Sequence, residues 1–381
     1  MAYTTIGTGS TIEIGLFFDK VLSGIHLTGN ATEWYWTAVI GLVLVVGLSL
    51  SEVKVITRTL LISELVGAAL VTLLSVVILV RTATGHGPHG QTLTAHFLQL
   101  PTGTGIGTIA GAAVFGFLAF AGFEGAATLG EETMNPKRDI PRALTVTVVI
   151  VGAFFLLTII SQSVGYGTSP TQVAAFAGAE SPYGDLAGQY LGQAMAVLLD
   201  FVASLSLFAI TLGTVNGAAR IGYALVRDAG VRGPLVRLTS RGAPAGTVAV
   251  VCTLIAVFIS GQRLAGTGVL DATFYWLTIG TIALLVAYAM ATLGAFRFLF
   301  FDGVARAPRW QAVVPILAMA FVLYTIYKNV VGVHGPYAVF PYIVLAVLVL
   351  AVLVVAALLV TLVPGLADRV RTRIAAGDEA P

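Results

Sequence analysis

Long apolar stretches dominate this sequence and limit the folds that it can adopt. Hydrophobic residues make up 57% of the 381 residues and charged residues only 10%, whereas a soluble domain carries about 25% charged residues. A soluble core cannot bury this much apolar surface, so most of it must face lipid. The sequence therefore predicts an all-α, polytopic membrane protein. The predicted spans are 34–52, 57–80, 106–130, 142–165, 190–219, 244–261, 272–296, 311–330 and 338–363.

Residues 1–33 do not form a clean span. Their first half is rich in Thr and Gly, and Glu13, Asp19 and Lys20 interrupt the apolar pattern. Such a segment is too polar for a free-standing membrane helix. We interpret residues 1–33 as a partial helix, whose start is missing, followed by an external loop. No signal-peptide pattern opens the chain.

The basic residues predict how the chain is oriented in the cell membrane. Alternating spans place sixteen of the twenty Lys and Arg residues on one face, which predicts a cytoplasmic face. The C-terminal tail, residues 364–381, then lies inside, and the Gly/Pro-rich segments 82–104 and 165–189 form external turns. The sixteen are Lys54, Arg58, Lys137, Arg138, Arg142, Arg220, Arg227, Arg232, Arg237, Arg241, Arg297, Arg306, Arg309, Arg369, Arg371 and Arg373.

Several functional classes lack their sequence patterns here. There is no Gly-x-Ser-x-Gly, His-Glu-x-x-His or P-loop pattern, so we expect neither an enzyme nor a nucleotide cofactor. His86, His89 and His96 have no carboxylate or cysteine partner at zinc-site spacing, so no metal site is expected. The net charge of +2 is too small and scattered for nucleic-acid binding. Any transport would have to run on an ion gradient or on exchange.

One apolar segment, residues 106–123, ends at a carboxylate. An isolated Glu in hydrocarbon is costly, so this residue should face protein or water. The alternation of aromatic and small residues before it suits a helix that is interrupted where a small ligand sits. Packing through small residues explains the glycines equally well, but not the glutamate. The residues at this end of the segment are Phe120, Ala121, Gly122, Phe123 and Glu124.

Other polar residues inside the predicted spans are candidates for the transport pathway or for ion coupling. Glu64 lies in the second span, and Asp200, Ser204 and Ser206 lie in the fifth. The alternative for each acid is an interfacial or interhelical hydrogen bond. The alternative for the hydroxyls is a bond to a carbonyl of their own helix.

Two compound motifs resemble the amino acid–polyamine–organocation (APC) superfamily of secondary transporters. The resemblance extends from about residue 3 to residue 363, and the first motif is similar to the sixth helix of that superfamily and the loop after it. The motifs are Phe120-Ala-Gly-Phe-Glu124 with Gly130-Glu-Glu132, Asn135-Pro136, Arg138 and Ile140-Pro141, and Asn216-x-x-x-Arg220-x-x-Tyr-Ala-Leu-x-Arg227-Asp-Ala-Gly230.

The resemblance implies two inverted five-helix repeats followed by two extra helices. Residues 34–80 are then the remainder of the first repeat, 106–296 the second repeat, and 311–363 the extra helices. Substrate would bind where the first helix of each repeat is unwound. The resemblance also implies that residues 120–124 hold the substrate. A cytoplasmic loop or gate would contain Glu131, Glu132, Asn135, Pro136, Arg138 and Pro141.

The leading hypothesis is an amino acid permease that moves amino acids or related amines by alternating access. Its expected partners are the substrate, the lipid bilayer and a coupling proton or sodium ion. The first two helices of the superfamily have no counterpart here, so the sequence predicts an N-terminally incomplete chain that does not transport by itself. The alternative is a non-transporting remnant or membrane scaffold with the same fold.

Overall fold

The structure is a computed structural model that describes residues 1–27, 34–51, 53–99, 105–123, 133–228, 230, 233–240, 242–301 and 308–361. Within these ranges every regular element is a helix, which confirms the predicted all-α class. The α-helices are α1 (Ala2–Gly24), α2 (Trp34–Ser49), α3 (Val53–Ala83), α4 (Ile106–Phe120), α5 (Pro136–Tyr166), α6 (Pro170–Gly178), α7 (Pro182–Leu191), α8 (Gln193–Asp228), α9 (Ala245–Leu264), α10 (Val269–Phe300), α11 (Val313–Val330) and α12 (Phe340–Thr361). Short 3-10 turns include η3 (Pro234–Val236), before α9, and η4 (Arg309–Ala312), before α11.

The long helices are those of a polytopic membrane protein. Seven helices of the described chain are long and apolar enough to cross a membrane, namely α3, α5, α8, α9, α10, α11 and α12 with their flanking turns. Two shorter apolar helices, α2 and α4, complete the set. Each of the nine predicted spans overlaps one of these helices. The third, 106–130, extends beyond the end of α4 at Phe120 into residues outside the described ranges. The predicted tail, residues 364–381, lies outside the described residues.

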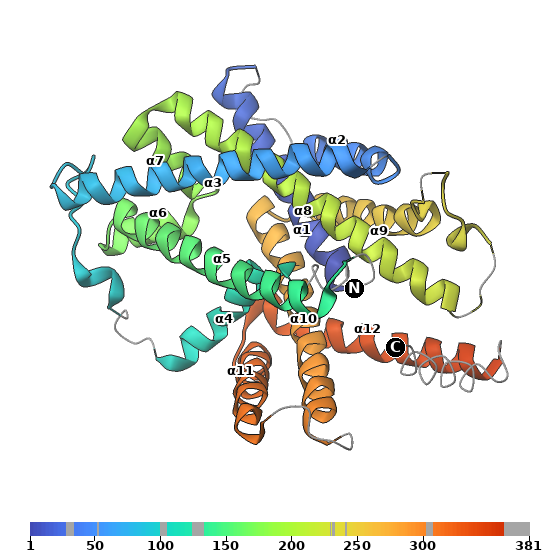
Figure 1. The fold of residues 1–381 in the computed structure, drawn as a ribbon. Coiled ribbons are helices and arrows are strands. Elements are labelled where there is room, and N and C mark those ends of the chain that lie inside the picture. Colours follow the sequence, from blue (N-terminus) through green and yellow to red (C-terminus); the bar gives the residue numbers. More distant parts are fainter. Residues whose placement is uncertain are drawn as a thin grey trace.

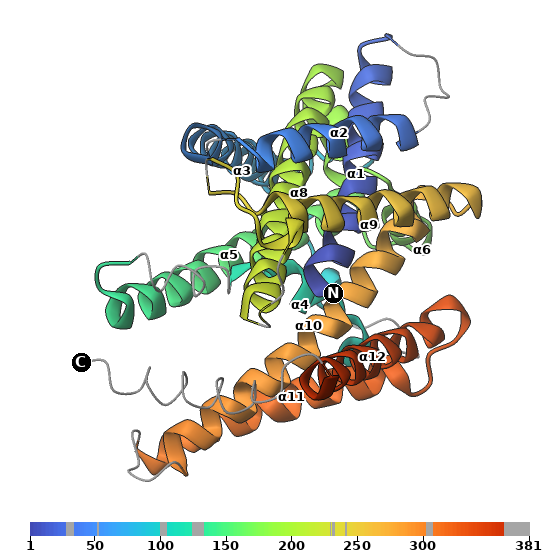
Figure 2. The same ribbon diagram turned by 90° about the vertical axis from the view of Figure 1, so that its right-hand side faces the viewer.

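Helix α1 occupies the centre of the bundle, although composition predicted only a partial helix there. It is a continuous helix of 23 residues that packs against α8, α10, α2 and α9 (Figures 1 and 2). Three of its buried hydroxyls bond within the helix: Thr5 donates to the Ala2 carbonyl at 2.9 Å, Thr8 to the Thr4 carbonyl at 2.9 Å and Thr11 to the Gly7 carbonyl at 2.6 Å. The polar composition therefore fits a helix surrounded by protein instead of lipid.

Glycines allow this close packing around α1. A Cβ on Gly7 would lie 2.9 Å from the hydroxyl of Thr214 on α8, and a Cβ on Gly9 would lie 2.7 Å from the side chain of Leu277 on α10. A Cβ on Gly280 of α10 would lie 2.7 Å from the side chain of Ile6 on α1. The small residues of α1 and its neighbours thus bring the helix axes together, as in other membrane bundles.

Three apolar clusters hold the bundle together. The first joins α1 and α2 to α8, α9 and α10 around Ile12, Val45 and Ile255. The second joins α3, α5, α7 and α8. The third joins α4, α10, α11 and α12 around Leu285. Helices α10 and α11 thereby form a long hairpin that projects from the rest of the bundle (Figure 1).

The predicted external turn at 165–189 is instead largely helical, and the sequence analysis was wrong there. Helices α6 and α7 fill most of it. Each begins with Ser followed by Pro, and the Ser side chains of Ser169 and Ser181 cap the first turns. Ser at the N-cap followed by Pro is a known pattern for the start of a helix. The prediction of a turn gave more weight to the Gly and Pro content of the segment than to this pattern.

Candidate functional site

Helix α4 ends inside the apolar segment where the sequence predicted an interruption. Its last residue is Phe120, and the Ala121 amide donates to the Leu118 carbonyl at 2.9 Å. Gly122 then takes a φ of 106°, a conformation that glycine adopts without steric cost. The sequence predicted that the third span is discontinuous near Phe120–Phe123. Regular helix ends at Phe120, and the residues where a second half-helix would begin lie outside the described part of the chain. The next candidates, Glu124, Glu131 and Glu132, lie outside the described residues.

The end of α4 has open space beside it within the described part of the chain. Apart from Gly122 and its two chain neighbours, no heavy atom of the described residues lies within 4 Å of the position that a Cβ on Gly122 would take. The last carbonyls of a helix have no intrahelical partner, and they carry the negative end of the helix dipole. The carbonyl end of α4 therefore favours a ligand cation over an anion.

Aromatic side chains surround this helix end. The Phe120 ring packs edge-on against Phe155 of α5 with centroids 5.3 Å apart, and Phe123 lies 6.2 Å from the ring of Tyr288 on α10. Gly152 of α5 leaves room for the Phe120 ring, whose tip would be 3.6 Å from a Cβ there. Phe155 and Tyr288 were not among the predicted site residues, because nothing in their local sequence relates them to α4.

Two of the candidate pathway residues form a direct contact. The hydroxyl of Ser206 on α8 donates to the carboxylate of Glu64 on α3 at 2.9 Å. Both residues are half-buried. One turn along α3, Gly67 lies so close to Val202 of α8 that a Cβ would meet its methyl group at 2.5 Å. The acid is thus held at a tight crossing of two membrane-spanning helices.

Asp200 and Ser204 belong to a different environment. Asp200 is 8% exposed, and it accepts a hydrogen bond from Ser181, the residue that caps α7. The Gly184 amide donates to the same Ser181 oxygen at 3.2 Å. Ser204 donates to the Phe201 carbonyl of its own helix at 2.7 Å. The structure therefore gives Asp200 an anchoring contact to α7 and gives Ser204 a bond within α8.

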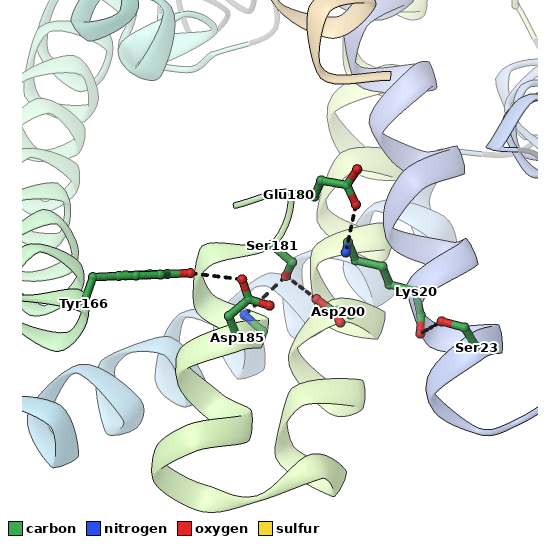
Figure 3. A network of polar contacts seen from close by, with 8 residues as sticks. Lys20, Ser23, Tyr166, Glu180, Ser181, Asp185 and Asp200 are labelled. Atoms are coloured by element: carbon green, nitrogen blue, oxygen red, sulfur yellow. Dashed lines mark hydrogen bonds and ion pairs between the residues drawn. The ribbon is translucent and has the colours of Figure 1, made fainter. Parts of the chain in front are cut away.

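The polar network around Asp200 extends to two further helices (Figure 3). Tyr166, at the end of α5, donates to Asp185 of α7 at 3.0 Å. Lys20 of α1 forms an ion pair of 3.0 Å with Glu180, which precedes α7. The segment 179–185 is consequently tied to α1, α5 and α8 at one end of the bundle.

The described members of the predicted cytoplasmic gate lie together at the start of α5. Asn135 is the N-cap residue and Pro136 the first helical residue. The Arg138 amide donates to the Asn135 carbonyl at 3.1 Å, and its side chain is exposed. Pro141 lies inside the first turns of the helix. These residues start a helix, as Pro at the first position favours.

Comparison with known proteins places the chain in a family. Residues 20–365 match the family "Amino acid permease". Among curated relatives, the "Branched-chain amino acid permease BcaP" of Bacillus subtilis (strain 168) is 30% identical over 135 residues, covering 35% of this chain and 28% of the relative. The protein of the same name from Lactococcus lactis subsp. cremoris (strain MG1363) is 29% identical over 178 residues, covering 44% and 36%.

A third relative has a different name. The "Putative arginine/ornithine antiporter" of Bacillus subtilis (strain 168) is 23% identical over 245 residues, which is 61% of this chain and 50% of the relative. The matches thus span half or less of the length of these relatives. The family match covers most of the chain, which therefore belongs to the amino acid permease family.

Proposed function

We propose that this protein is a secondary transporter that moves amino acids or related amines across the cell membrane by alternating access. The observation that carries the proposal is the end of α4 at Phe120, where Gly122 turns the backbone inside a membrane bundle. Non-helical backbone at membrane depth is tolerated only beside protein or a cavity. In transporters with broken helices, such backbone meets the charged groups of the substrate.

The proposed site holds the substrate ammonium at the carbonyl end of α4. The negative end of the helix dipole favours a cation there. Gly122 leaves the space open that a side chain would fill. Phe120, Ala121, Gly122, Phe123 and Glu124 form the proposed binding segment, with Glu124 assigned from the sequence motif alone.

The surroundings of α4 support a substrate with an apolar side chain. Phe120 packs against the ring of Phe155, and Phe123 packs against the ring of Tyr288. An apolar, aromatic lining favours apolar ligand groups, while a few polar atoms fix the orientation. Two relatives are named as branched-chain amino acid permeases, which agrees with this lining. We therefore assign neutral amino acids with apolar side chains as the main substrate class.

The proposal gives Glu64 the coupling role. An ionisable residue inside a membrane span is costly and marks a pathway or proton relay. The Glu64 carboxylate accepts a hydrogen bond from Ser206 at 2.9 Å, which holds it at the crossing of α3 and α8. In this proposal Asp200 anchors α7 to α8 and Ser204 bonds within α8. Residues 131–141 form the gate on the cytoplasmic side.

The test is uptake by proteoliposomes that contain the protein expressed from its complete reading frame, including any coding sequence upstream of Met1. Radiolabelled leucine, isoleucine, valine, arginine, ornithine and putrescine are offered separately, with and without an imposed proton gradient. We expect saturable uptake of the branched-chain amino acids, with competition among them. Preferential uptake of arginine or ornithine would reassign the substrate class. Absence of saturable uptake or binding for every compound would overturn the proposed function in favour of a non-transporting scaffold.

A pair of glycine variants tests the site itself. Gly122→Leu places a side chain where the substrate ammonium is proposed to sit, and we expect uptake to fall to background. Gly192→Leu is the matched control, since Gly192 has a similar φ of 98° and also has open space beside it, so both variants carry the same backbone strain. Wild-type uptake by Gly122→Leu, with Gly192→Leu unchanged, would remove Gly122 from the site.

A further inference from the structure

The α10–α11 hairpin carries an apolar pocket at its tip. The pocket has a volume of about 330 Å³ and lies between the end of α10 and the start of α11. Figures 1 and 2 show this hairpin extending away from α1 and α9, so the pocket is far from the proposed substrate site at the end of α4. Its lining residues are Leu299, Phe300, Trp310, Gln311, Val314 and Pro315.

The pocket continues into an exposed apolar stripe along α11. Val314 and Leu317 share one helix face by their spacing of three residues, and they are 65% and 64% exposed. The stripe ends at Phe321, whose ring packs against Phe117 of α4 with centroids 5.5 Å apart. Trp310 at the pocket mouth is 71% exposed. A hydrocarbon chain can therefore lie along α11 with one end in the pocket, and Trp310 lies where an aromatic belt meets lipid headgroups.

A cationic residue, Arg309, adjoins the pocket mouth. Arg309 directly precedes Trp310, is exposed, and forms no ion pair with any carboxylate in the described ranges. Arg297 lies in the last turn of α10, one turn before Phe300. Arginine is well suited to phosphate because its guanidinium presents several donors in a fork. Basic pockets between membrane helices on the cytoplasmic side bind anionic headgroups, and the distribution of Lys and Arg predicts that both arginines lie on that side.

We propose that this pocket is a binding site for an anionic phospholipid. One acyl chain occupies the pocket and the stripe along α11, and Arg309 contacts the headgroup phosphate. The amide of Gln311 is a further donor at the pocket mouth. The charge complementarity selects an anionic lipid over a zwitterionic one. This inference goes beyond amino acid transport and does not depend on it.

Fluorescence quenching of Trp310 tests the proposal. A variant of the full chain is made with the substitutions Trp34→Phe, Trp36→Phe and Trp276→Phe. Trp310 is then its only tryptophan. It is placed in nanodiscs that contain either brominated phosphatidylglycerol diluted in plain phosphatidylcholine, or brominated phosphatidylcholine at the same fraction in plain phosphatidylglycerol. We expect stronger quenching in the first mixture, because phosphatidylglycerol is enriched at Trp310.

Two variants and a control connect the preference to the pocket. Arg309→Gln should lower the preference for phosphatidylglycerol about fivefold, since one cation near the surface contributes roughly that factor. Val314→Phe fills the pocket, keeps Arg309, and should also lower the preference. Arg237→Gln is the matched control, because Arg237 is an exposed cation of the same predicted side, next to η3 and outside the pocket lining.

Native mass spectrometry of the protein with all its tryptophans gives an independent measurement. The retained phosphatidylglycerol adduct should decrease in Arg309→Gln and persist in Arg237→Gln. Equal quenching by both brominated lipids would show an unselective lipid contact and overturn the proposal. Absence of quenching by either lipid would mean that protein covers the pocket, either a second copy or the C-terminal segment, and would also overturn it. So would equal effects of Arg309→Gln and Arg237→Gln.

Discussion

The backbone carbonyl of Trp34 lies against the α-carbon of Gly15, and no Cβ fits between them. The hydroxyl of Thr37 strengthens this crossing of α1 and α2, because it lies 3.1 Å from the Gly15 carbonyl and 2.9 Å from the Trp34 carbonyl. The central helix is thus held to its neighbour through backbone atoms, which cannot move aside as a flexible side chain can.

Gly15→Ala should destabilise the protein. The added methyl meets backbone, and overpacking of this kind costs about 1–3 kcal/mol. Gly47→Ala in α2 is the matched control, because a Cβ there meets nothing within 4 Å and alanine favours a helix. The melting temperatures of both variants in detergent check the prediction. It is wrong if Gly15→Ala melts at or above the temperature of Gly47→Ala.

Asp200→Ala should cost more stability than Ser204→Ala. Removal of the carboxylate leaves the buried Ser181 hydroxyl without its acceptor, and an unsatisfied buried group costs about 1–3 kcal/mol. Ser204 bonds to its own helix, so its replacement disturbs no contact between helices. Thermal unfolding of the two variants and of Asp200→Asn gives the comparison. Equal melting temperatures for Asp200→Ala and Ser204→Ala would show that the contact to α7 contributes nothing.

Glu64→Gln should uncouple uptake from an imposed proton gradient. The amide can still accept from Ser206, but it cannot bind or release a proton in the relevant range. We expect substrate binding to persist while stimulation by the gradient is lost. Ser63→Ala is the control, because the Ser63 hydroxyl donates to the Leu60 carbonyl of its own helix. Full stimulation of Glu64→Gln by the gradient would remove Glu64 from the coupling role.

Two cysteine positions test the predicted orientation. His89 lies in the segment 82–104, predicted to be external, and Met134 precedes α5 on the predicted cytoplasmic side; both are exposed. The native Cys252 is buried, so it gives little background. An impermeant thiol reagent on intact cells should label His89→Cys and not Met134→Cys, whereas both should react after the membrane is permeabilised. The reverse pattern on intact cells would invert the topology.

The sequence alone determined the class of this protein and the location of its membrane helices. Runs of apolar residues place the nine spans, because a helix in lipid must be apolar along its whole crossing. The compound motif around Phe120–Pro141 indicated the family, which the match over residues 20–365 confirmed. The end of α4 was also foreseen, since Gly122 is a local feature and its conformational freedom belongs to the residue itself.

Tertiary structure alone decided the role of α1 and the pairing of the polar residues. Composition shows that Ala2–Gly24 is too polar for lipid, but not that α8 and α10 surround it. The partners of Glu64 and Asp200, Ser206 and Ser181, lie 142 and 19 residues away in the chain. Hydropathy reports how each segment interacts with solvent or lipid. Contacts between segments depend on which helix faces meet, and in this bundle close approaches at glycines such as Gly15 and Gly67 determine those faces.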